Sequence, residues 1–575
     1  MNLSRTLAVA RGDEPADLLL KNTRLVNVLS GEIHPADIAI AGPVIAGVTA
    51  GIGTGYSGRQ EIDLGGRYVC PGLLDAHVHI ESSMVTPAEL SKALVPRGVT
   101  TIVTDPHEIA NVMGLDGIRF MLADAAYAVL NVRVNVPSCV PATDLETSGA
   151  RLEAMDLEEL LSDPRVLGLA EVMNFPGVVQ GDEGVLAKLR VFRERVKDGH
   201  CPGLTGHRLS AYAASGISSD HECVTVEEAR EKLRAGLAVF LREASNAKNL
   251  RDLLPIVTPA NERRLCLCTD DRHPIDLLEE GSIDHLVRVA IAEGVAPLTA
   301  IRMATLNTAE HYRMDDRGAV APGRRADLMV FSDLDAPRAE MVFASGELVA
   351  QDGEMKVKTL RRRYDHLPRT VRIDPESLEL GIRAGGTQAR PARVIGAIPN
   401  QLITRHLTRE VPVRDGCAVA DPANDLLKMA VIERHHGTGN VGLGFVSGIG
   451  LTRGAIASTV AHDHHNLVVI GADDVSMRTA ALAVAEEGGG QAVAVGERAV
   501  TTLPLPIAGL MSTWEIGHVR DSMRRLLDAA HHNGAQLRDP FMAMSFLALE
   551  VIPSLKLTDK GLVDVERFEV VPLFV

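Results

Sequence analysis

The middle of the chain, residues 66–315, alternates short apolar runs with longer amphipathic segments. The runs have the length and the β-branched content of buried strands. Eight of them recur, at 69–74, 100–104, 132–136, 166–170, 195–197, 217–219, 238–241 and 265–268. The segments between them space apolar residues three and four apart, as helices packed on a sheet do. This alternation predicts an α/β fold with a (β/α)8 TIM barrel, whose active site lies at the carboxyl ends of the strands.

Both flanks of the barrel share another pattern, in which short β-type runs are separated by Gly and Pro. Residues 1–65 and 316–370 show it, and neither segment looks helical. We therefore expect one small β-sandwich, built from both sides of the barrel. Beyond a charged connector near 360–380, residues 385–575 predict a separate C-terminal α/β domain. The elements expected in this domain are helices at 421–435 and 518–532 and strands at 441–446, 467–470 and 491–495.

Composition narrows the class of partner. The chain has 575 residues and a net charge of −16, and only 3% of its residues are aromatic. A nucleic-acid surface needs a basic face with stacking rings, so this balance argues against one. A hydrophobic content of 46% and a charged content of 23% are typical of a globular protein with a large core. A small uncharged or cationic ligand fits these numbers.

The cysteines and the N-terminus indicate a compartment. Seven cysteines are scattered along the chain without a CxxC pair, which is typical of reduced cytosolic proteins. The N-terminus has no apolar core of a signal peptide, and no apolar run approaches the length of a membrane span. We expect a cytoplasmic protein with no membrane partner, and a homo-oligomer with a dimer as its form.

The first predicted barrel strand, at 69–74, begins the segment VCPGLLDAHVHIESS, residues 69–83. Side chains along a strand alternate with a period of two, so His77 and His79 leave it on the same side. Two imidazoles at one strand end are a natural start for a divalent-metal site. The alternative interpretation is a pair of surface histidines behind a buried strand.

Ionisable side chains also follow five other predicted strands. The second strand is followed by Asp105, His107 and Glu108, the fourth by Glu171 and the fifth by His200. The sixth is followed by Asp220, His221 and Glu222, and the eighth by Asp270 and Asp271. Buried charges are costly unless they are paired or bind a metal. This concentration of acids and imidazoles at one end of a barrel therefore predicts a cation site. Its oxygen and nitrogen donors suit Zn, Mn or Fe.

This arrangement resembles the amidohydrolase superfamily, in which HxH follows strand one, a carboxylate strand four, histidines strands five and six, and an aspartate strand eight. The motifs PGLLDAHVHIESS, TDPHEIANV, AEVMNFPGV, KDGHCPGL, SGISSDHE and CTDDRHP resemble the prokaryotic adenine deaminase family more closely. The stretch NVGLGFVSGIGLTRGAIASTVAHDHHNLVVIG is similar to that family's own extra domain. The resemblance covers essentially the whole chain.

The resemblance implies hydrolytic deamination of adenine to hypoxanthine and ammonia by metal-activated hydroxide, in purine salvage. It implies two divalent cations per subunit, Mn or Fe with Zn as the alternative. The implied ligands are His77, His79, Glu171, His200, His221 and Asp270. Glu171 takes the bridging place that a carboxylated lysine holds in dihydroorotases and hydantoinases. His207 follows the same short run as His200, and the DGH motif favours His200.

Catalytic roles follow from the chemistry of the implied reaction. Asp270 would accept the proton of the hydroxide and pass it to the departing amine. Attack at C6 is easier when ring N1 is protonated, so an acid is needed, with Glu222 as the first candidate and Glu81 as the second. A salt-bridging role is the alternative for either glutamate. His107 and Glu108 lie at the rim and could orient substrate or bind metal, and Asp220 and Asp271 are further candidates that flank ligands.

The C-terminal domain carries a histidine-rich segment, AHDHHN at 461–466. It is either a polar turn between two strands or a loop that closes over the barrel mouth, and His462, Asp463 and His464 are the residues to test. Other functions stay open: action on another aminopurine such as an N6-substituted adenine, or on a cyclic amide, and a non-catalytic scaffold. A zinc deaminase of nucleic acids would show HxE…PCxxC, which this sequence does not contain.

Overall fold

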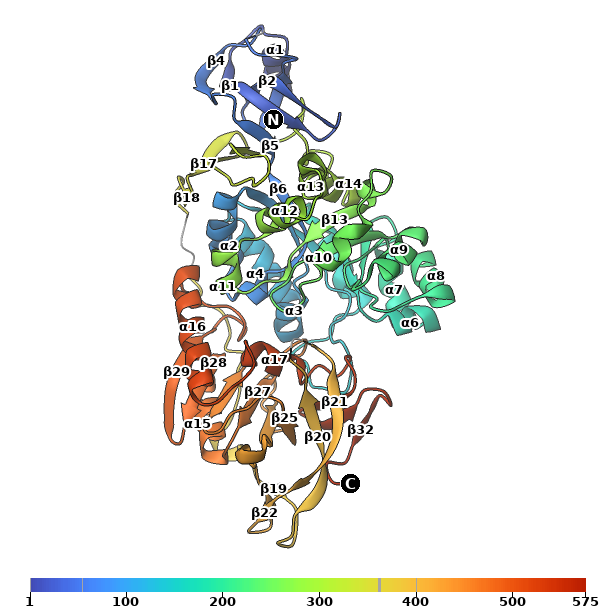
Figure 1. Ribbon diagram of the computed structural model, residues 1–575, viewed down its shortest axis with the longest axis vertical. Coiled ribbons are helices and arrows are strands. Elements are labelled where there is room, and N and C mark those ends of the chain that lie inside the picture. Colours follow the sequence, from blue (N-terminus) through green and yellow to red (C-terminus); the bar gives the residue numbers. More distant parts are fainter. Residues whose placement is uncertain (1, 54, 360–362, 400) are drawn as a thin grey trace.

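The computed structural model describes residues 2–53, 55–359, 363–399 and 401–575. A β-rich N-terminal part, a barrel with its helices and a C-terminal sheet domain follow one another along the long axis of the molecule (Figure 1). The connector expected near 360–380 begins with residues 360–362, which lie outside the described residues. Within the described residues, no helix combines the length and the apolar character needed to cross a membrane.

The two flanks of the barrel form one nine-stranded sheet in the order β18-β17-β16-β15-β5-β1-β2-β3, with β4 beside β1. Its strands are β1 (Ala16–Asn27), β2 (Glu32–Ala41), β3 (Val44–Val48), β4 (Gly58–Asp63), β5 (Tyr68–Pro71), β15 (Leu328–Phe331), β16 (Met341–Ala344), β17 (Glu347–Gln351) and β18 (Glu354–Met355). The seam between the flanks is antiparallel, with Val330 opposite Val69. Because β5 leads directly into the first barrel strand, this sheet anchors the amino end of the barrel.

A helix, α1 (Leu3–Ala10), precedes this sheet, so the expectation that the first 65 residues contain no helix is wrong. Asn2 caps the helix, because its side chain accepts a hydrogen bond from Arg5 N at 3.2 Å. One buried face, with Thr6 and Val9, was too short to show a helical period in the sequence.

The predicted TIM barrel is confirmed. Its parallel strands form two arcs, β10-β9-β8-β7-β6-β14 and β11-β12-β13. They are β6 (Leu73–His79), β7 (Val99–Thr104), β8 (Asn131–Val136), β9 (Val166–Val172), β10 (Val196–Gly199), β11 (Ser219–Asp220), β12 (Ala238–Arg242), β13 (Leu265–Cys268) and β14 (Asp270–Asp271). Ser218 N donates to Lys197 O at 2.9 Å, which joins β10 to β11. At the other gap the chain runs from β13 into β14, which pairs with β6, so the ring of strands closes.

Helices surround this ring of strands (Figure 1). They are α2 (Pro87–Leu94), α3 (His107–Met113), α4 (Leu115–Ala125), α5 (Ala154–Glu158), α6 (Phe175–Gln180), α7 (Glu183–Val191), α8 (Gly206–Ala214), α9 (Val226–Arg234), α10 (Leu250–Leu253), α11 (Pro274–Glu279), α12 (Ile283–Ala292), α13 (Pro297–Met303) and α14 (Leu306–His311). The apolar faces of these helices and the outward faces of the strands share one large core.

The C-terminal domain is built on an eight-stranded sheet in the order β21-β20-β25-β24-β27-β26-β28-β29. Its elements are β20 (Arg390–Ala397), β21 (Thr404–Val411), β24 (Leu427–Ile432), β25 (Val441–Ser447), β26 (Ala455–Ser458), β27 (Leu467–Gly471), β28 (Gly490–Val495), β29 (Arg498–Pro504), α15 (Asp474–Glu486), α16 (Ile516–His532) and α17 (Pro540–Phe546). Two small sheets add β19 (Ile382–Arg383), β22 (Val413–Arg414) and β23 (Cys417–Ala418), and β30 (Leu555–Thr558), β31 (Gly561–Asp564) and β32 (Glu569–Val571).

The helix predicted at 421–435 is wrong, because this segment forms the central strand β24. Asp421 and Pro422 resemble a helix start but form a single 3-10 turn, Pro422–Asn424. The strand pairs with β25 on one side and β27 on the other, and every one of its residues is buried. A strand buried on both faces has no alternating polar positions, so its sequence does not distinguish it from a buried helix.

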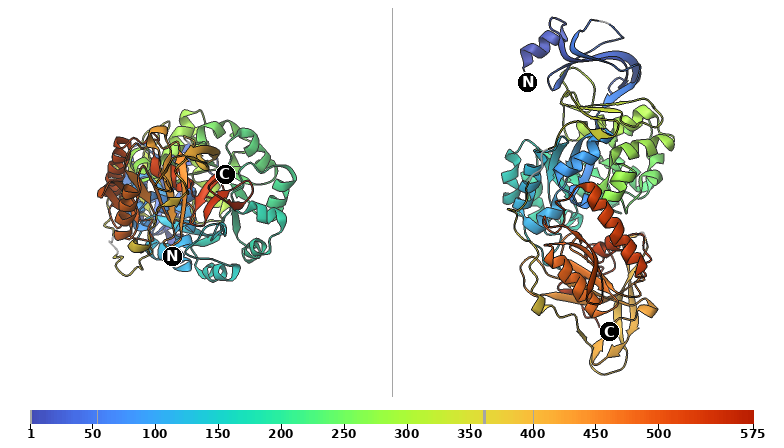
Figure 2. Two further views of the ribbon diagram at one scale, coloured as in Figure 1. Left: turned by 90° about the horizontal axis from the view of Figure 1, so that it is seen from below. Right: turned by 90° about the vertical axis from the view of Figure 1, so that its left-hand side faces the viewer.

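The C-terminal domain lies against the end of the barrel at which the strands terminate, as both views in Figure 2 show together with Figure 1. Ser512 N donates to Met84 O at 2.8 Å, just beyond the end of β6. The side-chain amide of Asn466 donates to Glu146 Oε1 at 2.7 Å. The carboxyl ends of the barrel strands are therefore enclosed between two domains.

Candidate metal centre

The end of β6 brings two imidazoles together inside the barrel. His77 and His79 are both buried, and their Nε2 atoms lie 3.1 Å apart. His79 Nδ1 lies 2.9 Å from the backbone oxygen of Asp105, so Nδ1 carries the proton and donates it there. The lone pair of His79 is therefore on Nε2, which faces the centre of the cluster, as in metal-binding histidines.

Glu171, at the end of β9, lies between two pairs of histidines. Its Oε1 is 3.3 Å from His79 Nε2 and 3.9 Å from His77 Nε2. Its Oε2 is 2.6 Å from His200 Nδ1 and 3.2 Å from His221 Nε2. Each oxygen thus faces one pair, which is the arrangement of a carboxylate that can bridge two cations.

Asp270 closes the cluster from the opposite side of the barrel. Its Oδ1 is 3.2 Å from His79 Nε2 and 3.6 Å from His77 Nε2. The backbone of Asp270 has φ 56°, in the left-handed region that residues other than glycine seldom adopt. Strained backbone of this kind is common at functional sites, and here it turns the carboxylate toward the histidines.

Arg242, the last residue of β12, holds the carboxylates in place. Its Nη1 donates to Asp270 Oδ2 at 2.9 Å and also contacts Glu222 Oε1. Burial raises the pKa of Glu222, but Arg242, His200 and His221 together outweigh burial and lower the pKa below its usual range. An ionised carboxylate accepts protons, so the structure argues against Glu222 as the acid. Arg242 was missed although it directly follows the seventh predicted strand, the position that revealed the other residues.

The donor set fits a divalent cation. Three overlapping groups of buried donors have ligand atoms within 4.8 Å of one another: His77, His79 and Asp270; His77, Glu171 and His221; and His79, Asp105, His107 and Glu171. Burial disfavours charge on His221, yet Glu171 beside it raises the pKa to about 9. Crowded carboxylates that raise the affinity of an imidazole for a proton also favour a metal cation in place of that proton.

Two other predicted site residues have structural partners. Asp220 Oδ2 lies 2.8 Å from the buried Lys232 Nζ, and its Oδ1 accepts from Cys201 N at 2.8 Å, so its oxygens are already used. Asp271 is half-buried and accepts a hydrogen bond from Ser82 Oγ. Neither carboxylate faces the histidines of the cluster directly. His207 is exposed on α8, whereas His200 contacts Glu171.

Glu81 differs from these two residues because one of its oxygens has no partner. Its Oε1 accepts from Ile109 N at 3.1 Å, and its buried Oε2 makes no hydrogen bond within the described residues. Burial raises the pKa of this carboxyl to about 7. Glu81 therefore has the properties of an acid near neutral pH, which Glu222 lacks.

The C-terminal residues singled out from the sequence separate into two groups. His462 and Asp463 reach the barrel, where His462 Nδ1 contacts Glu108 Oε1 and Asp463 Oδ1 lies 3.9 Å from His107 Nε2. His464 faces elsewhere, 3.8 Å from Glu146 Oε2 and 3.7 Å from Glu550 Oε1. His465, which was not singled out, contacts Glu108 Oε2 instead.

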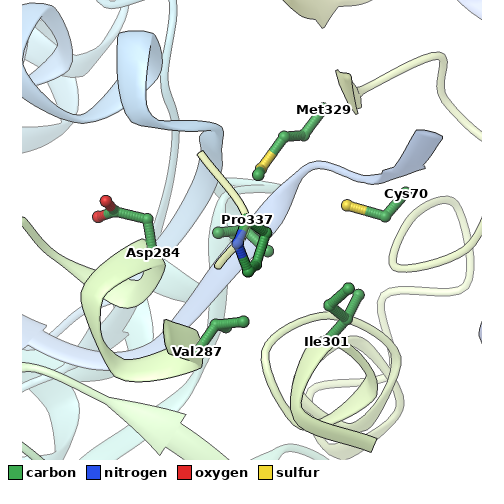
Figure 3. Close-up of a pocket in the computed structure, with 7 residues that line it drawn as sticks. Cys70, Asp284, Val287, Ile301, Met329 and Pro337 are labelled. Atoms are coloured by element: carbon green, nitrogen blue, oxygen red, sulfur yellow. The ribbon is translucent and has the colours of Figure 1, made fainter. Parts of the chain in front are cut away.

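A small apolar pocket lies at the other end of β6, away from the cluster. Figure 3 shows Cys70, Val287, Ile301 and Met329 around it, with Asp284 at its edge. The carboxylate of Asp284 already accepts from Ser282 N and Arg288 Nη1, each at 2.8 Å. This pocket therefore offers no free polar group to orient a ligand.

Comparison with known proteins gives two family matches and many full-length relatives. Residues 68–349 match the amidohydrolase family, and residues 401–569 match the adenine deaminase C-terminal domain. A protein of Desulfatibacillum aliphaticivorans named adenine deaminase is 50% identical over 99% of both chains. Two more proteins have that name. The one from Cereibacter sphaeroides strain KD131 is 48% identical over 99% of this chain and 100% of the relative. The one from Methanothrix thermoacetophila is 47% identical over 100% of both chains.

Proposed function

This chain belongs to the adenine deaminase family of amidohydrolases, and from this premise we propose that it hydrolyses adenine to hypoxanthine and ammonia. The observation that carries the proposal is the place of Glu171, which presents one oxygen to His77 and His79 and the other to His200 and His221. This arrangement, in an enclosed site, suits the attack of activated water on an aromatic C–N carbon.

The enzyme depends on a divalent metal, as its family and its buried donor cluster indicate. We propose two cations per subunit, with Glu171 as the shared ligand. The proposed ligands are His77, His79, Glu171, His200, His221 and Asp270. When bound, a divalent cation lowers the pKa of water from 15.7 toward about 7 and so supplies a nucleophile at neutral pH.

Asp270 is positioned to move the proton. Its Oδ1 faces the histidine pair, and its Oδ2 is held by Arg242 at 2.9 Å, so the carboxylate stays ionised and oriented. Burial raises the pKa of Asp270, but His77, His79 and Arg242 outweigh burial and lower it. We propose that Asp270 accepts the proton of the attacking water and transfers it to the departing amine, which leaves as ammonia.

The proton on ring N1 requires an acid, and we propose Glu81 for this role. It lies directly beyond β6, two residues after His79, and its Oε2 is buried without a hydrogen-bond partner among the described residues. The ion pair with Arg242 gives Glu222 a different role, as an acceptor near His221 Nε2 at 3.5 Å. An ionised Glu222 is suited to accept a hydrogen bond from an N–H group of the adenine ring.

Absorbance of adenine, followed with purified enzyme in the presence of Mn, Fe or Zn, tests the function. We expect conversion to hypoxanthine that a chelator abolishes and that Asp270→Asn lowers by at least about 10³-fold. Asp252→Asn, which removes an exposed carboxylate on α10, is the matched control and should keep wild-type rates. Absence of turnover of adenine with every metal, together with turnover of an N6-substituted adenine or a cyclic amide, would overturn the substrate assignment.

Three finer predictions accompany this function. We propose Mn or Fe as the cations, with Zn as the alternative, because the proposed donors are imidazoles and carboxylates. We also propose a homodimer and a cytoplasmic location, where the seven free cysteines would remain reduced. Metal analysis, light scattering and cell fractionation test these predictions separately.

A further inference from the structure

A second group of metal-type donors lies where the C-terminal domain meets the barrel. We call it the junction cluster, and define it as His107 and Glu108 of α3 with His462 and Asp463 of the C-terminal domain. Each of the four residues is at least nine-tenths buried. The donor atoms of His107, Glu108 and Asp463 lie within 4.8 Å of one another. The two nitrogen and two oxygen donors come from two domains, and Glu108 and His462 are more than 350 residues apart in the sequence.

His107 is oriented toward this cluster. Its Nδ1 lies 3.1 Å from Asp105 Oδ2, so Nδ1 carries the proton and donates it to that carboxylate. The lone pair is then on Nε2, which lies 3.2 Å from Glu108 Oε1 and 3.9 Å from Asp463 Oδ1. A histidine whose first nitrogen is fixed by a carboxylate and whose second nitrogen faces other ligand atoms is the usual form of a metal ligand.

His465 supports the cluster without belonging to it. The backbone N–H of Ala461 donates to His465 Nδ1 at 3.1 Å, so this nitrogen carries the lone pair and Nε2 carries the proton. His465 Nε2 then donates to Glu108 Oε2. This bond holds one oxygen of Glu108 and turns the other, Oε1, toward His107 and His462.

His462 is placed by the C-terminal domain itself. The ring of His462 stacks on Phe546 of α17 at 4.9 Å, and its backbone N–H donates to Ser545 Oγ at 3.1 Å. These contacts leave Nδ1 directed at Glu108 Oε1. His462 is therefore positioned before any ligand binds, which lowers the cost of binding one.

One buried oxygen of the cluster, Asp463 Oδ2, has no hydrogen-bond partner among the described residues. Glu108 Oε1, by contrast, lies between His462 Nδ1 and His107 Nε2. A buried carboxylate oxygen without a partner is costly, because it has lost water and gained nothing. Asp463 and Glu108 both have ligand atoms that converge with His107. A cation bound between Asp463, Glu108 and His107 would compensate the unpartnered oxygen of Asp463.

We propose that the junction cluster binds a divalent transition-metal cation, separate from those of the central site, through His107 Nε2, Glu108 Oε1, His462 Nδ1 and Asp463. The nitrogen and oxygen donors suit Zn, Mn or Fe. Because its ligands come from α3 and from the segment 461–466, this cation joins the C-terminal domain to the barrel beside the catalytic cluster. Binding stabilises the docked arrangement of the two domains, and this stabilisation rises with the logarithm of the free metal concentration once that concentration exceeds the Kd.

Metal analysis of purified holoenzyme tests the proposal without reference to activity. We expect Asp463→Asn and His462→Asn each to contain one equivalent of metal per subunit less than the wild type. Asp37→Asn is the matched control, because Asp37 is also a buried carboxylate but lies in the N-terminal sheet, where it accepts from Asn22 N at 2.8 Å. This control should keep the wild-type metal content, and an equal loss in it would overturn the proposal.

A second comparison separates this site from the central one. In a His77→Asn background, which weakens the central cluster, Asp463→Asn should still remove one equivalent. If that loss disappears, the effect of Asp463 passes through the central site, and the proposal is wrong. Wild-type crystals measured at the absorption edge of the metal provide a test that needs no variant. An anomalous peak about 2.0–2.2 Å from His107 Nε2 is expected, and no peak there would overturn the proposal.

Discussion

Arg242 controls the charge of two carboxylates in the metal centre, Asp270 and Glu222. We predict that Arg242→Met shifts the acid limb of the pH profile of kcat/KM to higher pH. Without the guanidinium the carboxylate pKa values rise, so Asp270 becomes protonated earlier as the pH falls. The pH dependence of kcat/KM for the wild type and the variant is the measurement.

Arg242→Lys is the matched control for this prediction, because it keeps the positive charge and loses the fork of donors. We expect its acid limb to lie between those of the wild type and Arg242→Met. Coincident acid limbs in all three proteins would show that Arg242 does not set the charge of the site. Circular dichroism should accompany the kinetics, since breaking a buried ion pair costs about 3–5 kcal/mol.

Lys556 is a buried lysine whose ammonium donates to two backbone oxygens, Leu402 O at 2.9 Å and Phe546 O at 2.7 Å. Burial lowers its pKa to about 7, against the opposing effect of Glu550. In the unfolded chain this pKa is about 10.4, so between pH 7 and 10 the unfolded state binds the proton and the folded state does not. Raising the pH therefore stabilises the folded state, by at most about 1.4 kcal/mol per pH unit.

We predict that the melting temperature of the wild type, relative to Lys556→Met, rises from pH 7 to pH 9. Differential scanning calorimetry of both proteins across this range measures the difference. Lys560→Met is the control for removal of a lysine, because Lys560 is exposed in the same hairpin. A difference that stays constant with pH would contradict the folded-state protonation inferred for Lys556.

At the scale of elements, the helix α15 depends on its N-cap. Asp473 accepts hydrogen bonds from Ser476 N and Ser476 Oγ, both at 2.7 Å. We predict that Asp473→Ala lowers the free energy of unfolding by about 1 kcal/mol, because an amide at the helix start loses its acceptor. Asp473→Asn keeps an acceptor and should cost less. Urea denaturation of both variants compares them, and equal losses would indicate that the charge rather than the cap matters.

The barrel strands show how far the sequence predicts elements. Strands with apolar runs and a clear start, such as β7 and β8, lie close to their expected bounds. The run predicted as one strand at 69–74 instead divides between β5 (Tyr68–Pro71) and β6 (Leu73–His79). The weak run at 195–197 forms β10 (Val196–Gly199), a residue further along the chain. Strand β24 was predicted as a helix because both of its faces are buried, so its neighbours in the sheet, and not its own pattern, determine its conformation.

At the scale of the whole molecule, the C-terminal domain encloses the metal centre, and Asp559 is one of its contacts with the barrel. Its carboxylate accepts from Thr147 N at 2.9 Å and from Thr147 Oγ1 at 2.6 Å. We predict that Asp559→Ala loosens the junction, because two charge-assisted hydrogen bonds are lost. Hydrogen exchange of residues 143–148 and 459–466 should then become faster.

Glu569→Ala, an exposed substitution on β32 of the same small sheet, is the control and should leave this exchange unchanged. Faster exchange in both variants would mean that the sheet itself had been destabilised. Unchanged exchange in Asp559→Ala would show that other contacts, such as Asn466 with Glu146, are sufficient to dock the domains.

The sequence alone determined the barrel and the family, because these depend on local signals, and it predicted the six ligands through the family resemblance. Strand periodicity and the residue that follows each strand are both local in the chain. The same rule applied to the seventh strand would have identified Arg242. Only the tertiary structure decided which carboxylates are ionised, since the pKa of Glu222 depends on Arg242, a residue from a neighbouring strand.

Only the tertiary structure, likewise, distinguished the histidines of the C-terminal segment. In the sequence, His462, His464 and His465 are equivalent members of one polar run. In the fold, His462 and His465 face Glu108 of α3, while His464 faces Glu146 and Glu550. Local patterns encode secondary structure, but the partner of a polar side chain is set by chain segments hundreds of residues away. Docking of the two domains, and not the local sequence, therefore decided the junction cluster.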